Sequence, residues 1–307
     1  MKHIFIVNPT SGHGLAKTVV PMIKEYFEKN PQDYEIIMTE GKGHASTIAS
    51  RYSIRDNVTL YSVGGDGTAY EVLNGINDHV CMAIIPAGTG NDYYRNLEYP
   101  EKNLHKILIE TIEGKEALVD YGIANDRRFM NCTTMGFDAD INVLANDIGS
   151  RFPIPRSLVY LVSTLIKLSH LRVMDITITL PNETIQIKSL LTAVMNGKWY
   201  GGGFQPTPMS SIQDGYFDLC IVKETNLSTV LRLLPKYMKG THINEKIVTF
   251  VKADSFKLQT SEPVNMGSDG ETQVETEIVF RLMKGGLTLR VPKASPLKER
   301  ELYEVRE

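Results

Sequence analysis

The stretch GGDGT, residues 64–68, places one aspartate among glycines directly after a short apolar run. Glycines carry no Cβ and let backbone N–H groups approach an anion, and Thr68 adds a hydroxyl where a helix is expected to begin. The carboxylate of Asp66 would repel a phosphate unless a divalent cation such as Mg²⁺ lies between them. The loop therefore predicts a phosphate site with a metal, and the alternative is that Asp66 merely caps the helix.

Two further loops of this kind follow other apolar runs: NPTSG at residues 8–12 and PAGTGND at residues 86–92. Neither matches the P-loop pattern, and the dinucleotide-binding GxGxxG pattern is absent after the first apolar run, which argues against both classes. Neutral hydrogen-bonding groups for a nucleotide come from these loops and from the end of another apolar run: Asn8, Thr10, Ser11, Thr39 and Thr89. For NPTSG alone, an ordinary turn is an equally good interpretation.

Two acidic turns in the second half of the chain could also carry chemistry: SDGE at residues 268–271 and SIQDGYF at residues 211–217. A carboxylate in a tight turn can act as a base for a hydroxyl group, which is a poor nucleophile at neutral pH. Oxygen atoms of Ser211, Asp214 and Tyr216 have a spacing compatible with one hard cation. Hairpin turns without a ligand remain the alternative for both segments.

The first hundred residues must position the glycine loops, and they alternate between two kinds of element. Short apolar runs predict buried strands at residues 4–7, 34–38, 60–63 and 82–85. Helix-like stretches lie near residues 15–29, 44–53 and 68–77. This alternation predicts an open, mainly parallel sheet with helices, in which the loops after the strands gather at one edge.

From about residue 116 the pattern changes to short alternating strands separated by polar turns, which predicts a β-rich, sandwich-like domain. One helix is expected near residues 156–170, with apolar side chains at amphipathic spacing: Leu158, Leu161, Val162, Leu165 and Leu168. Basic residues flank or lie within it: Arg151, Arg156, Lys167 and Arg172. It either packs on the β-rich domain or faces anionic lipid.

The predicted domains are residues 1–118, an α/β domain whose glycine loops would bind a nucleotide, and residues 119–290, a β-rich domain that contains the two acidic turns. Residues 291–307 form a charged final segment that either returns to the first domain or frays. Two domains are also the first expectation for 307 residues.

The composition of the chain argues against some classes of protein and indicates its compartment. The net charge of −3 argues against general nucleic-acid binding. The three cysteines, at positions 81, 132 and 220, lie in separate apolar runs, which predicts buried thiols in a reducing cytosol. The N-terminal apolar run is too short for an export signal and no run is long enough to span a bilayer, so we expect a cytoplasmic protein that reaches a membrane only from its inner surface.

The combination of motifs resembles the diacylglycerol kinase catalytic-domain superfamily over residues 2–292. The segments that carry the resemblance are, in order, NPTSGHG, GGDGTAYEVLNG, PAGTGNDYYR, VDYG, NCTTMGFDAD, NGKWYGGGFQPTP, DGYFDL and DGE. The chain is most similar to bacterial diacylglycerol kinases and related lipid kinases. GGDGT alone is shared with NAD kinases, whereas the later segments separate the lipid kinases from them.

The resemblance implies an NAD-kinase- and diacylglycerol-kinase-like fold, and it implies roles for individual positions. Nucleotide-binding positions would be Asn8, Pro9, Thr10, Ser11, Gly12, Thr39, Gly64, Gly65, Asp66, Gly67, Thr68, Ala69, Tyr70 and Thr89. Glu271 would be the catalytic proton acceptor and Asp269 a second essential acid. Ser211, Asp214 and Tyr216 would form a magnesium site, and Asp66, Asp92 and Asp120 a network linking metal and nucleotide.

The resulting prediction is a Mg²⁺-dependent lipid kinase that transfers the γ-phosphoryl group of ATP to a lipid hydroxyl, with diacylglycerol as the leading substrate and phosphatidic acid as the product. A homodimer is a further expectation of the resemblance. Three alternatives remain: a kinase for another hydroxyl lipid such as a sphingosine-like one, an NAD kinase, and a catalytically dead lipid- or nucleotide-binding regulator. The residues Ala69, Tyr70, Tyr93, Tyr94 and Pro208 depart from the usual family pattern around the ATP and lipid pockets.

Overall fold

The computed structural model describes residues 1–151, 156–169 and 171–300. Residue 170 of the predicted helix, residues 301–307 of the predicted final segment and the side chains of Arg156, Leu158, Leu161 and Leu165 lie outside the described part. The chain forms two compact units. Unit 1 comprises Met1–Tyr121, Ile212–Gly215 and the chain from Met283 onwards, and unit 2 comprises Gly122–Ser211 and Tyr216–Leu282.

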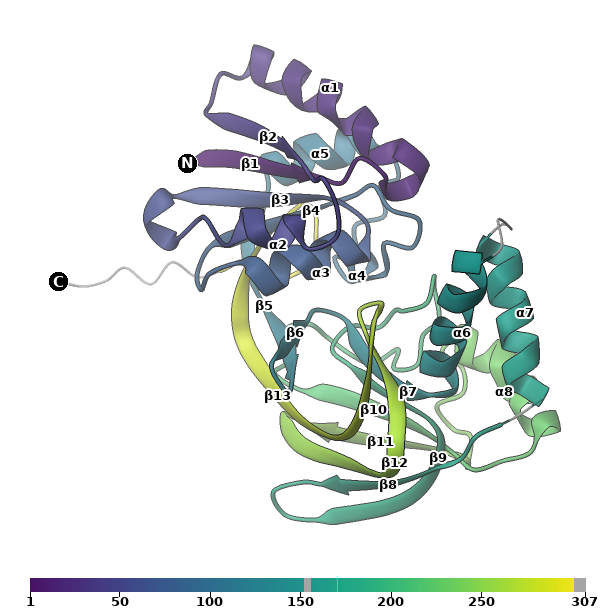
Figure 1. The fold of residues 1–307 in the computed structure, drawn as a ribbon. Helices are drawn as coiled ribbons and strands as arrows, with labels where there is room; N and C mark the ends of the chain where they lie inside the picture. Colours follow the sequence, from purple (N-terminus) through teal and green to yellow (C-terminus); the bar gives the residue numbers. More distant parts are fainter. Residues whose placement is uncertain (152–155, 170, 301–307) are drawn as a thin grey trace. The chain divides into compact units, whose positions relative to one another are not determined.

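Unit 1 is built on a parallel sheet in the order β2-β1-β3-β4-β13 (Figure 1). Its first four strands are β1 (Lys2–Val7), β2 (Tyr34–Met38), β3 (Val58–Gly64) and β4 (Cys81–Pro86). The C-terminal part of β13 (Glu271–Val291) adds the last strand, with Leu289 opposite Met82. Each of the first four strands is a short apolar run ending in a polar or glycine-rich loop, as the sequence predicts.

Helices cover both faces of this sheet (Figure 1). They are α1 (Leu15–Lys29), α2 (His44–Ala49), α3 (Asp66–Gly75), α4 (Asp92–Arg95) and α5 (Leu104–Ile112), with short 3₁₀ turns at Ser11–Gly14 and Ile54–Asp56. On one face, the side chains of α1 and α5 share a core with Phe5, Tyr61 and Ala83, which lie side by side across β1, β3 and β4. The opposite face carries α2 and α3.

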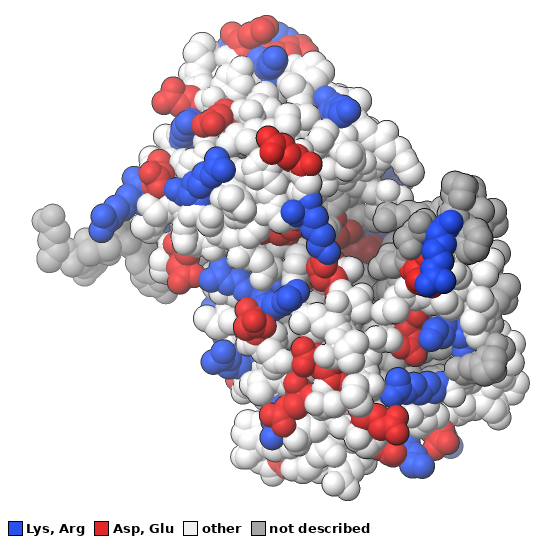
Figure 2. Space-filling view, viewed as in Figure 1, with Lys and Arg blue, Asp and Glu red and all other residues white. Residues whose placement is uncertain are grey.

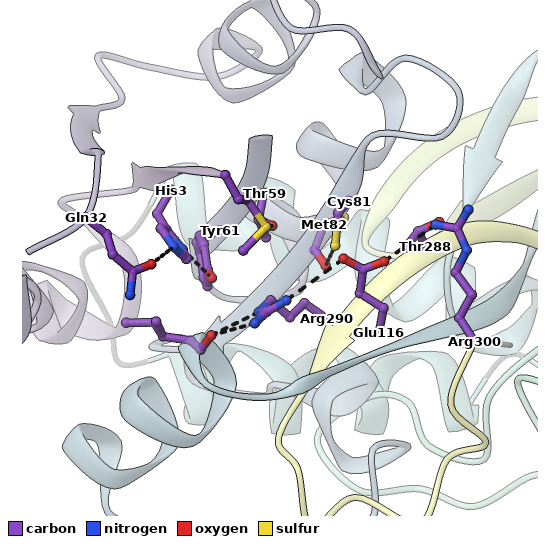
Figure 3. A network of polar contacts seen from close by, with 12 residues as sticks. His3, Gln32, Thr59, Tyr61, Cys81, Met82, Glu116, Thr288, Arg290 and Arg300 are labelled. Carbon is purple, nitrogen blue, oxygen red and sulfur yellow. Dashed lines mark hydrogen bonds and ion pairs between the residues drawn. The ribbon is translucent and has the colours of Figure 1, made fainter. Parts of the chain in front are cut away.

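A polar network ties the end of β13 into unit 1 (Figure 3). The guanidinium of Arg290 donates from Nε and Nη2 to the carbonyl oxygen of Ile112, at 3.0 and 2.8 Å. Glu116 lies 3.9 Å from Arg290 and 3.5 Å from Arg300. Arg290 of the last strand is therefore held by the carbonyl oxygen of Ile112 and by Glu116, which also binds Arg300.

Unit 2 is β-rich and built from antiparallel strands. They are the distal part of β5 (Lys115–Ala124), β6 (Arg127–Phe129), β7 (Cys132–Gly136), β8 (Met174–Thr179), β9 (Thr184–Met195), β10 (Phe217–Lys223), β11 (Val248–Ala253), β12 (Ser255–Ser268) and the first part of β13. Strands β9 and β12 each pair with β7 at one end and with β8 at the other. Four phenylalanines lie in the core that these strands enclose: Phe129, Phe217, Phe256 and Phe280.

The described residues of unit 2 form three helices: α6 (Phe137–Arg151), α7 (Arg156–Ser169) and α8 (Leu227–Met238). The sequence predicts only the second of them, so the expectation of a single helix is wrong. No helix of the described residues combines the length and apolar character needed to cross a bilayer. On the face drawn in Figure 2, acidic and basic side chains are interspersed over both units.

The predicted fold class is confirmed: an α/β unit with an open parallel sheet and a β-rich second unit. The structure adds that Ile212–Gly215, from the middle of the sequence, belongs to unit 1. The predicted boundaries at residues 118 and 290 are not tested by this and stay predictions.

Candidate active site

Two of the predicted phosphate loops touch each other through bare backbone in unit 1. A Cβ placed on Gly88 would lie 2.2 Å from the Cα of Gly65, and one placed on Gly65 would lie 3.2 Å from the Cα of Gly88. The third loop joins them, because a Cβ on Gly12 would lie 2.5 Å from the carbonyl oxygen of Ala87. Such contacts exclude any larger residue, so packing between the loops explains the glycines at these positions.

Polar side chains connect the same three loops. Asn8 donates from Nδ2 to the hydroxyl of Thr68 at 3.2 Å, and its Oδ1 accepts hydrogen bonds from Thr10. Asn91 fixes the third loop: its Oδ1 accepts from the N–H of Gly88, and its Nδ2 donates to the carbonyl oxygens of Gly88 and Pro86. Asn91 is not among the site residues predicted from the sequence, although asparagine is one of the residues that adopt the positive φ found here, 53°.

Asp66 binds backbone in the neighbouring loop. Its two carboxylate oxygens accept hydrogen bonds from the N–H groups of Asp92 and Tyr93, both at 3.1 Å, at the start of α4. It therefore caps a helix, though not the helix that it begins. Asp92 is close by, since a Cβ on Gly90 would lie 3.3 Å from Oδ2 of Asp66 and 3.6 Å from Oδ2 of Asp92.

The remaining predicted nucleotide-binding residues differ in accessibility. Thr39 lies at the carboxyl end of β2, where its N–H donates to the carbonyl oxygen of Val7, and Thr89 is exposed in its loop. Ala69 and Tyr70 are buried in α3, so their side chains belong to the core. Gly67 is different from the packed glycines, because a Cβ there would meet no atom within 4 Å. Its bare backbone leaves open space beside the loop.

Asp120 holds two turns together in unit 1. Its carboxylate accepts hydrogen bonds of 2.7 Å from the N–H groups of Gly215 and Gly285. Burial raises the pKa of Asp120, the two N–H groups oppose that rise, and the negative charge of Asp214 adds to it. The structure therefore brings Asp120 and Asp214 together, and it places Asp66 and Asp92 together at the glycine loops.

The candidate metal ligands form a hard, all-oxygen donor set. Asp214 belongs to the segment Ile212–Gly215 of unit 1, and Ser211 and Tyr216 flank that segment in the sequence. A carboxylate with backbone carbonyls is what Mg²⁺ accepts. Among the described residues there is no cluster of three or more His, Cys, Asp or Glu side chains that could hold a metal ion. A metal here would therefore need backbone carbonyls, substrate phosphates or water, which fits Mg²⁺.

In unit 2, Asp269 and Gly270 form the two-residue turn between β12 and β13. Both have positive φ, 44° and 95°, and Ser268 pairs with Glu271 across the turn, as in a type I′ hairpin. The carboxylate of Asp269 accepts hydrogen bonds from the N–H groups of Met130, Asn131 and Cys132. This turn is thus not merely a solvated hairpin, because its acid is fastened to another segment.

A third segment completes this cluster. Asn196 donates from Nδ2 to the carbonyl oxygen of Met130 at 2.6 Å, and Asn131 donates to the carbonyl oxygen of Trp199. The segments NCTTMG, NGKW and SDGE, far apart in the sequence, therefore meet around the carboxylate of Asp269. Half-buried Glu271 is the other acid of this turn, one residue beyond Gly270. The sequence analysis did not single out Asn131 or Asn196.

Comparisons with known proteins identify the family of both parts of the chain. Residues 2–124 match the diacylglycerol kinase catalytic domain, and residues 131–291 match the YegS C-terminal NAD kinase beta sandwich-like domain. A diacylglycerol kinase of Bacillus subtilis (strain 168) is 30% identical over 270 residues, which cover 87% of this chain and 88% of that protein. A diacylglycerol kinase of Staphylococcus carnosus is 29% identical over 302 residues, covering 97% of each chain.

Solved structures give the same result for the fold. A crystal structure from Bacillus anthracis str. Sterne covers 96% of this chain and 98% of its own, with a TM-score of 0.76 and 26% identity. A diacylglycerol kinase from the same organism matches with a TM-score of 0.70 and 23% identity over 96% of this chain and 98% of its own. The resemblance seen in the sequence is confirmed: the chain belongs to the bacterial diacylglycerol kinase family of lipid kinases.

Proposed function

We propose that this chain transfers the γ-phosphoryl group of ATP to the free hydroxyl of diacylglycerol in an Mg²⁺-dependent reaction that gives phosphatidic acid at the inner surface of the membrane. The observation that carries the proposal is the fastening of the SDGE turn. The carboxylate of Asp269 accepts hydrogen bonds from three backbone N–H groups, so it fixes the position of the turn. We assign proton transfer to Glu271, the other acid of the turn.

The nucleotide would bind to unit 1 at the edge where β1, β3 and β4 end. Gly67 offers backbone with open space, and the N-terminus of α3 favours negative charge there. Asn8, Thr10 and Thr68 already form a hydrogen-bonded set whose hydroxyl and amide groups suit phosphate or ribose oxygens. The interlocked glycines Gly65 and Gly88 keep this surface in one shape without further ordering on binding.

Mg²⁺ would neutralise the negative charge on the phosphates. It would be held by Asp214 with the carbonyl groups of Ser211 and Tyr216, or by phosphate oxygens near Asp66 and Asp92. Asp120 would position the first of these sites, because its carboxylate holds the N–H of Gly215, the residue after Asp214. Asp66 would position the loop that carries Asp92.

The reaction balances as an in-line displacement. The hydroxyl oxygen of the lipid attacks the γ-phosphorus, a new O–P bond forms, and the bond between the γ-phosphorus and the bridging oxygen breaks, with ADP as the leaving group. The hydroxyl proton passes to the carboxylate of Glu271. General-base assistance of this kind typically contributes about 10²–10⁴-fold to the rate.

The experiment is a phosphoryl-transfer assay on purified protein with radiolabelled ATP, with and without Mg²⁺, offering diacylglycerol, sphingosine and NAD side by side. We expect labelled phosphatidic acid only when Mg²⁺ is present. Label on NAD alone, or on none of the acceptors, would contradict the proposal. Sedimentation of the protein with lipid vesicles tests the surface location separately.

A further inference from the structure

Two side chains extend the strand order β9-β7-β12 of unit 2 beyond the ends of its strands. Asn196 directly follows β9, Asp269 directly follows β12, and residues 130–132 lie between them at the start of β7. Asn196 is completely buried. Its side chain can therefore influence a reaction only through other groups of the protein.

The peptide group that joins Met130 to Asn131 is hydrogen-bonded on both sides. Its carbonyl oxygen accepts from Nδ2 of Asn196 at 2.6 Å, and its N–H donates to Oδ1 of Asp269 at 3.1 Å. The next peptide group repeats this arrangement. Its carbonyl oxygen accepts from the N–H of Asn196 at 2.8 Å, and the N–H of Cys132 donates to Oδ1 of Asp269 at 2.9 Å. Two successive peptide groups therefore connect Asn196 to the carboxylate of Asp269.

Hydrogen bonds that run through one peptide group strengthen each other. A donor at the carbonyl oxygen makes the N–H of the same peptide group a better donor, so Asn196 stabilises the negative charge of Asp269 without touching it. The turn is also bonded directly to the same segment: the N–H of Asp269 donates to the carbonyl oxygen of Cys132 at 3.1 Å, and the hydroxyl groups of Thr133 and Ser268 lie 2.7 Å apart. The position of the turn thus depends on a segment that Asn196 holds.

We infer that Asn196 is a positioning residue of the proposed phosphoryl transfer: through the two peptide groups it holds the turn of Asp269, and with it Glu271, in place. The inference rests on the proposed function and adds to it a residue that contacts neither substrate. Misplacement of a reacting group by about 1 Å costs about 10²-fold in rate. Loss of the Asn196 amide should therefore lower kcat, whereas the nucleotide, which we assign to the loops of unit 1, should bind as before.

The test measures kcat and the KM for ATP in Asn196→Ala, with 1,2-dioctanoylglycerol in detergent micelles as the acceptor. We expect kcat to fall by about 10²-fold and the KM for ATP to keep its wild-type value. Ser189→Ala is the matched control, because Ser189 is equally buried on β9 and its hydroxyl donates to a different carbonyl oxygen, that of Val222. The control should lose stability and retain its kcat.

Unfolding in urea tests the same connection without turnover. Asn196→Ala and Asp269→Asn should together cost less unfolding free energy than the sum of their separate losses, because both break the same chain of hydrogen bonds. Ser189→Ala and Asp269→Asn should be additive. If Asn196→Ala does not fold, Asn196→Ser keeps a donor on a shorter side chain, and we expect smaller effects in the same direction in both measurements.

The possible outcomes separate this inference from the proposed function. Transfer to dioctanoylglycerol with a wild-type kcat in the Asn196 variant, or additive losses of unfolding free energy with Asp269→Asn, would overturn the inference alone. Absence of transfer to any glyceride by the wild type, together with the expected coupling between Asn196 and Asp269, would refute the proposed function alone.

Discussion

Gly65 and Gly88 are in backbone contact, so that a Cβ on Gly88 would stand 2.2 Å from the Cα of Gly65. The glycines of these loops therefore have two different reasons to be there. Gly65 and Gly88 are required by packing between the loops, whereas Gly67 is bare on a side that meets nothing within 4 Å. Mutations of Gly65 and Gly88 should therefore disturb the loops themselves, whereas a mutation of Gly67 should affect ligand binding.

Replacing Gly88 by alanine should damage the loops themselves. The added methyl group would collide with the backbone of Gly65 and approach Oδ1 of Asn91 to 2.8 Å. Overpacking of this kind costs about 1–3 kcal/mol, and we expect the free energy of unfolding in urea to fall by that amount together with the affinity for ATP. A Gly88→Ala protein with wild-type stability and wild-type ATP affinity would show that the loops are not interlocked.

Replacing Gly67 by alanine should have the opposite effect on stability. Gly67 is the second residue of α3, and alanine is preferred over glycine in a helix by up to ~1 kcal/mol, so the melting temperature should rise slightly. The methyl group would occupy the open space where we place the nucleotide, so the dissociation constant for ATP should increase. Calorimetric titration with ATP checks this, and unchanged affinity would remove Gly67 from the nucleotide site.

The two acids of the SDGE turn should respond differently to removal of their charge. Glu271→Gln should lower kcat by ~10²–10⁴-fold with ATP affinity retained, because the amide cannot accept the hydroxyl proton. Asp269→Asn places an amide N–H among three backbone N–H donors, and we expect a loss of about 1–3 kcal/mol in stability as well as activity. An unchanged kcat in Glu271→Gln, or wild-type stability in Asp269→Asn, would contradict this division of roles.

The sequence predicts the strand-and-loop pattern of unit 1 because each buried parallel strand is a continuous apolar run that ends at glycines. It could not reveal that Asp66 binds the backbone of Asp92 and Tyr93, since those donors are set by tertiary structure. The same holds for Asp269, whose donors lie 137–139 residues earlier in the chain. The positions of the loops could be predicted from the sequence, whereas the backbone partner of each carboxylate could not.

The helices that were missed in unit 2 have weak sequence signals for physical reasons. Helix α6 follows strand β7 directly, so no turn residues separate the two elements in the sequence. Helix α8 contains Pro235, which usually indicates the end of a helix.

Unfolding at mildly acidic pH should be promoted by His3, a buried residue of the network in Figure 3. Burial lowers the pKa of His3 in the folded state, and its ring bonds to Tyr61 and Gln32. The unfolded chain therefore binds the proton more readily, so stability present above pH ~6.5 is lost as the pH falls below that value. Relative to His3→Gln, we expect the wild type to lose stability between pH 7.5 and 5.5, measured by urea unfolding, and parallel pH profiles of the two proteins would exclude His3 as a contributor.

Asp138 should act on stability in the opposite direction. Burial raises its folded-state pKa to about 7, above the ordinary value of 3.8, so between these two pH values the folded protein binds a proton that the unfolded chain releases. Stability from this group is therefore present at low pH and is lost as the pH rises through about 7. Relative to Asp138→Asn, the wild type should gain up to about 2 kcal/mol between pH 7.5 and 5.5, at ~1.4 kcal/mol per pH unit. Because histidine protonation is common to both proteins, the difference between their urea unfolding curves isolates Asp138, and parallel pH profiles would show that this carboxylate is ionised in the folded state.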